Sequence, residues 1–132
     1  MIAIVCTFLT AIGFYFSIGL GDQWWVAWLA PIPVLWLAFG EMKPWTAFFS
    51  AFLGYALGAL NIVPAYAGAM PFVVVLAIAG PASLFAGSVV AARRVYHALG
   101  TIPAMFGFAA LWTTFDFLSS FSRAGGSVST PA

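Results

Sequence analysis

Residues 71–92 read PFVVVLAIAGPASLFAGSVVAA, an apolar run without a charged side chain, and the two residues that follow it are both arginine. The hydrocarbon core of a bilayer is about 30 Å thick, and an α-helix needs about 20 apolar residues to cross it. Backbone groups inside the core have to be hydrogen-bonded within the segment, which a helix achieves on its own. The stretch therefore predicts a membrane-spanning helix that is bounded by charge.

The composition of the whole chain supports the same interpretation. Of 132 residues, 64% are hydrophobic and only 5% are Asp, Glu, Lys or Arg, and the mean hydropathy is +1.10. A soluble domain carries about 25% charged residues. The chain has too few polar side chains to cover a water-facing surface, so lipid is expected to cover it. The net charge of +1 and the scattered basic residues give no basis for a nucleic-acid partner.

Four further stretches have the length and apolar character of spans, so we predict an all-α fold, a polytopic transmembrane helical bundle. The five expected spans are residues 2–20, 24–40, 45–66, 71–92 and 101–121, and the expected breaks are 21–23, 41–44, 67–70 and 93–97. Pro31, Pro33 and Pro81 fall inside spans and are expected to kink them. Residues 1–121 would form one membrane domain.

The basic residues predict the orientation of this domain. With a cytoplasmic N-terminus, Lys43, Arg93 and Arg94 all lie inside and Arg123 alone lies outside. The opposite orientation reverses this count. Because cytoplasmic loops carry an excess of Lys and Arg, the first orientation is favoured. Residues 122–132 would then form an outward-facing tail.

Small residues at four-residue spacing predict where the helices approach one another closely. Three such motifs occur: Gly13-x3-Ser17-x3-Gly21, Gly54-x3-Gly58 and Ser83-x3-Gly87-x3-Ala91. Cys6, the single cysteine, lies in an apolar run and is predicted to be a small buried hydrophobic residue. The sequence contains no pattern that would hold a metal ion or a cofactor, and we expect none.

Asp116 is the polar residue that costs most to place in a membrane, about 2.5–3.5 kcal/mol at mid-bilayer. Asp116 and Asn61 each lie five residues from the outer end of their spans, so they are expected to share a depth. Two interpretations stay open. Asp116 pairs with Asn61 or Arg123 and fixes helix register, or it contributes to a polar floor that docks a headgroup, a substrate or another domain. The candidate residues for such a site are Asp116, Asn61, Tyr66, Trp24, Trp25 and Arg123.

Three segments carry a resemblance to a known family. They are FSIGLGDQWWVAWLAPIPVL at residues 16–35, FLGYALGALN at 52–61 and AALWTTFDFL at 109–118. From about Gly13 onward the chain resembles the N-terminal membrane portion of bacterial apolipoprotein N-acyltransferases, with the three segments in the same order. Asp116 stands where the family usually has Glu, and Ile62 stands where an aromatic residue is usual.

The resemblance implies a bacterial plasma (inner) membrane protein that helps to transfer an acyl chain from a membrane phospholipid to the N-terminal cysteine of a lipoprotein. The family carries its Glu–Lys–Cys triad in a large outer nitrilase-like domain, which this sequence does not contain. We therefore expect this chain alone to be inert and assign it no catalytic residue. The alternatives are a small transporter or channel subunit, with Asp116 and Asn61 along its path, and a structural membrane protein without chemistry.

Overall fold

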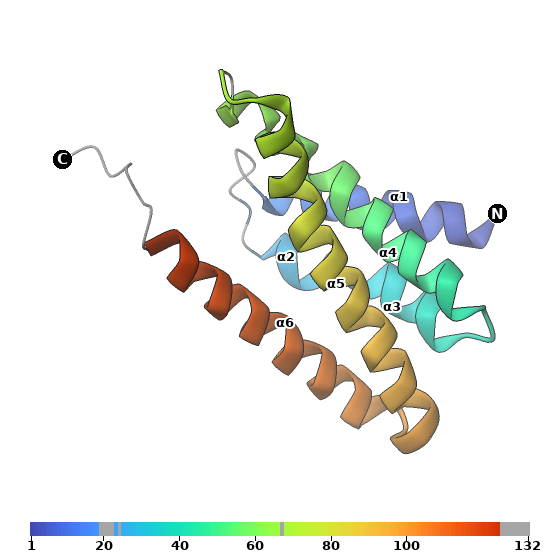
Figure 1. Cartoon of the computed structure of the whole chain (residues 1–132). Helices are drawn as coiled ribbons and strands as arrows, with labels where there is room; N and C mark the ends of the chain where they lie inside the picture. The colour runs from blue at the N-terminus through green and yellow to red at the C-terminus, as the bar shows by residue number, and fades with distance from the viewer. Residues whose placement is uncertain (19–22, 24, 67, 125–132) are drawn as a thin grey trace.

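The computed structural model describes residues 1–18, 23, 25–66 and 68–124, with side chains up to residue 118. These residues form an all-α helical bundle, as predicted (Figure 1). Its elements are α1 (Ile2–Ser17), α2 (Val26–Leu29), α3 (Ile32–Phe39), α4 (Pro44–Gly58), the 3₁₀ helix η2 (Ala59–Tyr66), α5 (Pro71–Leu99) and α6 (Thr101–Ala124).

The helices run alternately up and down the bundle. α1 and α4 run in the same direction and pack side by side, while α5 packs antiparallel against α4. α3 lies against α1, α4 and α5. α6 packs mainly on α5 and lies at the edge of the bundle, leaning away from the other helices toward its C-terminal end (Figure 1).

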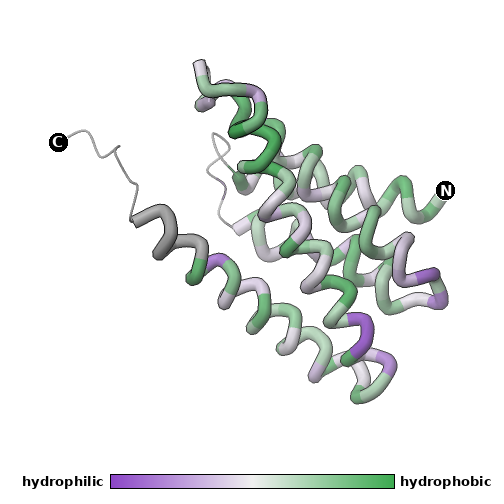
Figure 2. Tube along the Cα trace, viewed as in Figure 1, coloured by the Kyte–Doolittle hydropathy of each residue, from purple (hydrophilic) through white to green (hydrophobic). Residues whose placement is uncertain are grey.

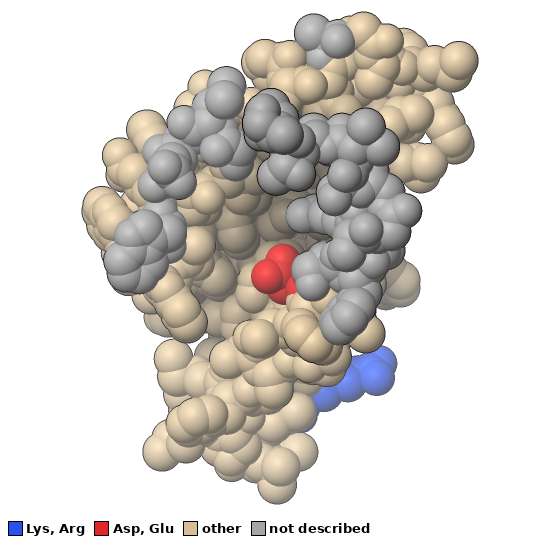
Figure 3. All heavy atoms as spheres, turned by 90° about the vertical axis from the view of Figure 1, so that its left-hand side faces the viewer, with Lys and Arg blue, Asp and Glu red and all other residues tan. Residues whose placement is uncertain are grey.

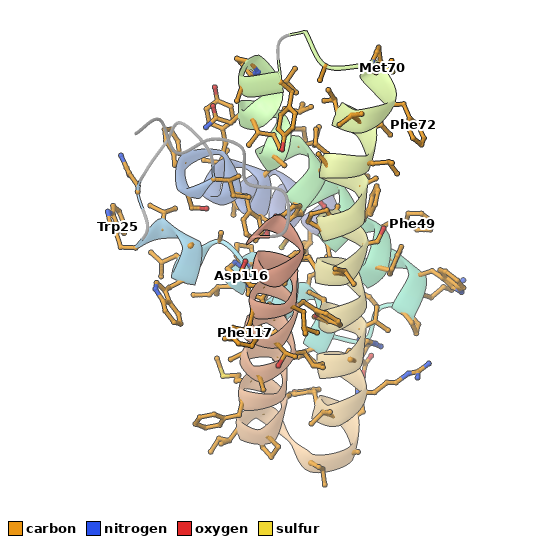
Figure 4. The ribbon with its side chains drawn as sticks, turned by 60° about the vertical axis from the view of Figure 1, so that its left-hand side comes forward. Trp25, Phe49, Met70, Phe72, Asp116 and Phe117 are labelled. Carbon is orange, nitrogen blue, oxygen red and sulfur yellow. The ribbon has the colours of Figure 1, made fainter. Side chains whose placement is uncertain are left out.

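Three helical segments are long and apolar enough to cross a membrane: Pro44–Tyr66, Pro71–Leu99 and Thr101–Leu118. The predicted first and second spans appear, within the described residues, as the shorter apolar helices Ile2–Ser17 and Val26–Phe39. Large apolar side chains are exposed on the outside of the bundle, as Phe49 and Phe72, 56% and 69% exposed, illustrate (Figure 4). Hydrophobic residues predominate along the described helices (Figure 2). Such a surface suits lipid and does not suit water.

The helix boundaries confirm one predicted proline kink and correct one predicted break. The second apolar segment is interrupted at Ala30 and Pro31, between α2 and α3, in agreement with the expected effect of proline. The break predicted at residues 93–97 is wrong, because α5 continues through Arg93 to Leu99. Charged residues end the apolar part of a helix without ending its backbone hydrogen bonds. α5 stops only at Gly100, whose φ of 92° is a left-handed conformation that favours glycine.

Two of the three predicted small-residue motifs provide close helix contacts. A Cβ atom at Gly58 would lie 2.4 Å from Cβ of Phe14, and one at Gly54 would lie 2.9 Å from Cγ2 of Thr10. α4 therefore lies directly on α1 through its glycines. At Gly13 the added atom would lie 2.8 Å from Cα of Ala30, so the segment between α2 and α3 packs on α1 in the same manner. Gly21, the last residue of this motif, lies outside the described residues.

The motif predicted on α5 is wrong. A Cβ atom at Gly87 would meet nothing within 4 Å, and Ser83 is exposed and donates a hydrogen bond of 2.7 Å to the carbonyl of Ala79 in its own helix. α5 instead turns Phe85 and Val89 inward, both with no exposed surface. The packing face of α5 combines these two side chains with the small residues Ala82, Ala86, Ser88 and Ala92, and Gly87 faces outward.

Candidate functional site

An aromatic cluster joins four helices in the upper half of the bundle. Phe85 of α5 lies at its centre, with ring centroids 5.0 Å from Phe14, 5.6 Å from Tyr55, 5.3 Å from Trp112 and 5.9 Å from Phe108. Trp112 also lies 5.7 Å from Tyr55. The contact between Trp112 and Tyr55 joins α6 to α4.

Asp116 lies one helical turn beyond Trp112 on the same face of α6, because residues four apart in a helix are neighbours. It is exposed. Figure 3 shows the side of the molecule toward which α6 leans, with a hollow between the helices and one acidic group at its floor. That group is Asp116, since Glu41, the other acid that the structure describes, lies at the opposite end of the bundle. In Figure 4 Asp116 lies well below Met70 and Phe72, which mark the N-terminal end of α5. The carboxyl group is therefore recessed.

Asn61 was one expected partner of Asp116, but its amide bonds to backbone carbonyls at the end of the first helix. Its Nδ2 donates hydrogen bonds of 2.9 Å to the carbonyls of both Tyr15 and Ile18. These carbonyls belong to the C-terminal end of α1, where the helix leaves acceptors without partners of its own. An asparagine amide has two N–H donors, and both are engaged here. Asn61 thus fixes η2 to the end of α1.

The remaining candidate residues divide into two groups. Tyr66, at the end of η2, and Trp25, just before α2, are 38% and 54% exposed, and Trp25 projects away from the bundle (Figure 4). Trp24 and the side chain of Arg123 lie outside the described residues. Of the two candidates that Figure 4 labels, Asp116 lies among the helices and Trp25 projects away from them.

Sequence reasoning missed an anchoring role for Arg93. Its guanidinium donates hydrogen bonds to the carbonyls of Ala38, Gly40 and Met42, the last with an N–O distance of 2.5 Å. These groups lie at the C-terminal end of α3 and in the loop that follows, where a cation also meets the negative end of the helix dipole. The pattern Arg-Arg after an apolar run signals a membrane boundary, but it does not reveal that one arginine reaches back across the bundle.

The structure offers no catalytic constellation in its described part. Cys6 is 5% exposed and lies in the packed face of α1, which agrees with its predicted role as a buried hydrophobic residue. No group of three His, Cys, Asp or Glu side chains that could hold a metal ion occurs among the described residues.

The fold and the surface define the class of protein: an all-α bundle with three helices that are long and apolar enough to span a membrane. Comparisons with known proteins add no name to this class. Neither a family model, nor a curated protein, nor a solved structure matches the chain.

Proposed function

We propose that this chain is the membrane portion of an apolipoprotein N-acyltransferase-like protein in a bacterial plasma membrane, and that its hollow around Asp116 receives an amine-bearing substrate. The observation that carries the proposal is the carboxyl group of Asp116 at the floor of the hollow, one helical turn from Trp112. It occurs in the third of the three segments that resemble the family, at the position where the family has an acid.

The chemistry of the hollow favours an amphiphile with an ammonium group. A carboxylate near a protein surface attracts a cation more strongly than it would in bulk water. Trp112, which lies one turn away and packs on Phe85, provides apolar surface for a hydrocarbon chain. An aminophospholipid headgroup and the amino terminus of an acceptor lipoprotein both carry the required ammonium group.

This chain would bind and orient the substrate, and an outer domain would carry out the acyl transfer. Glu41 and Lys43 lie in the short loop before α4, and Cys6 is buried in α1. A buried thiol without an adjacent base is a poor nucleophile. Binding energy from the hollow would place the acyl donor or the acceptor for the thioester chemistry of a nitrilase-like partner domain.

Photo-crosslinking tests the proposal directly. The chain is reconstituted with a trace of an aminophospholipid that carries a photoactivatable group near its headgroup, and crosslinked residues are mapped by mass spectrometry. We expect adducts on α6 between Trp112 and Leu118, and we expect Asp116→Asn to reduce them severalfold. Glu41→Gln, the same change of acid to amide at the other end of the bundle, is the matched control.

Two results would contradict the proposal. One is equal crosslinking of the chain and the Asp116→Asn variant at matched levels in the membrane. The other is equal labelling by a probe whose headgroup amine has been acetylated, because that probe lacks the cation. Asn keeps the size of Asp and inserts at least as readily, so failed insertion would not account for a loss.

A further inference from the structure

A second cavity lies at the end of the bundle where the basic residues gather. It has a volume of about 430 Å³ and lies between the start of α4 and the last turns of α5. Its lining residues are Pro44, Val90, Arg93, Arg94, His97 and Ala98. Figure 2 shows that hydrophilic residues of the α3–α4 loop and of the C-terminal part of α5 lie together at this end.

The lining residues of α5 form one stripe along the helix. Val90, Arg94, His97 and Ala98 are spaced at i, i+4, i+7 and i+8, the spacing that places residues on one face. Along this stripe the surface changes from apolar at Val90 to cationic at Arg94. Lipids have the same order, with an acyl chain followed by a phosphate.

The position of the stripe along the membrane normal also agrees with that of a bound lipid. The apolar stretch from Pro71 to Ala92 is about 33 Å long at 1.5 Å per residue, enough to cross a hydrocarbon core of about 30 Å. Arg94 and His97 follow directly, about 3 and 7 Å further along the helix axis, which is the level of the headgroups.

The two arginines at this cavity have different tasks. Arg93 donates hydrogen bonds to the carbonyls of Ala38, Gly40 and Met42, so its guanidinium is engaged in contacts within the protein. Arg94 and His97 are exposed. A guanidinium can bind phosphate oxygens through two parallel hydrogen bonds, and an imidazole N–H can add a third.

From this arrangement we infer that the cavity between α4 and α5 binds the phosphate group of an anionic phospholipid in the leaflet on the side of Arg94, with the acyl chains descending along Val90. This site is separate from the hollow at Asp116. It uses other side chains and the opposite charge, so either proposal can fail while the other holds.

Native mass spectrometry of the full chain in detergent, titrated with phosphatidylglycerol, measures this binding. We expect Arg94→Gln to weaken binding about fivefold, since one basic residue at an anionic membrane surface is worth about 1 kcal/mol. Lys43→Gln is the control, because Lys43 is exposed in the loop before α4 and does not line the cavity. This variant removes the same charge at the same end of the bundle, and we expect less than a twofold effect.

Arg94→Lys separates a shaped site from a simple charge. It keeps the cation and removes the two-pronged geometry, so binding should fall between that of the natural chain and that of Arg94→Gln. Thermal unfolding followed by circular dichroism should be unchanged in all three variants without lipid, which shows that they fold.

Three outcomes would overturn the inference. Equal losses in Arg94→Gln and Lys43→Gln would reduce the effect to general surface charge. Phosphatidylcholine that binds as tightly as phosphatidylglycerol would exclude selection for an anionic lipid. Displacement of the lipid by inorganic phosphate, beyond that caused by chloride at the same ionic strength, would assign the cavity to free phosphate.

Discussion

Replacing Gly58 by alanine should destabilise the bundle, because the new methyl group has no space. The added Cβ would lie 2.4 Å from Cβ of Phe14, 2.8 Å from the carbonyl oxygen of Ala11 and 3.1 Å from the nitrogen of Tyr15. Carbon atoms in contact normally lie about 3.5–4.0 Å apart. Two of the three obstructing atoms belong to the backbone of α1, so α1 has to move away by about 1 Å. Overpacking of this kind costs about 1–3 kcal/mol.

Gly87→Ala is the matched control, since it makes the same change inside a membrane helix where nothing lies within 4 Å. Alanine favours the helix by up to about 1 kcal/mol over glycine, so this variant should be neutral or slightly more stable. The two variants should therefore differ by about 1–4 kcal/mol in the free energy of unfolding. Reversible unfolding in mixed micelles of dodecyl maltoside and dodecyl sulfate, followed by circular dichroism, measures the difference. Equal stabilities of the two variants would refute the close contact between α1 and α4.

Three other substitutions test the remaining contacts by the same unfolding measurement. Arg93→Gln should lower the free energy of unfolding by about 2 kcal/mol, because it removes charged hydrogen bonds to the end of α3. Arg94→Gln, its control, should change the free energy of unfolding by less than about 0.5 kcal/mol. Similar losses in the two variants would argue against the anchoring role of Arg93. Thr10→Val should stabilise the bundle by about 1 kcal/mol, since the buried Oγ1 of Thr10 has no hydrogen-bond partner. A loss of stability would reveal a partner for that hydroxyl. Asn61→Asp should destabilise the bundle by about 1–3 kcal/mol, because a carboxylate cannot donate hydrogen bonds to the carbonyls of Tyr15 and Ile18. Unchanged stability would show that these hydrogen bonds contribute nothing.

The fold class could be predicted from composition because hydrocarbon content alone decides between lipid and water as the surrounding solvent. The packing of Gly54 and Gly58 was also predictable, as small residues four apart permit close approach. The same rule failed at Gly87, since a stripe of small residues does not reveal which face of a helix turns inward. On α5 that choice follows from Phe85, whose ring fits among rings of three other helices.

Contacts between distant segments could not be predicted. Asn61 bonds to α1, 46 and 43 residues earlier in the chain, and Arg93 bonds to carbonyls more than 50 residues earlier. The sequence shows that both side chains need partners, because polar groups in or near a membrane have to be satisfied. Which partners they find depends on how the helices pack. Asp116 was identified from its cost in a bilayer, whereas the hollow around it depends on how α6 leans away from the bundle (Figure 1).

Single cysteines introduced at positions 116 and 94 test the central claim, that one membrane bundle presents a recessed acidic site outward and a basic cavity inward. Asp116→Cys and Arg94→Cys are made separately in a Cys6→Ala background and treated in intact cells with a membrane-impermeant maleimide. We predict that the cysteine at 116 is labelled from outside, because water reaches the hollow. The cysteine at 94 should be labelled only after the cells are opened. Labelling of both positions from the same side, or no labelling of position 116 from either side, would contradict the account.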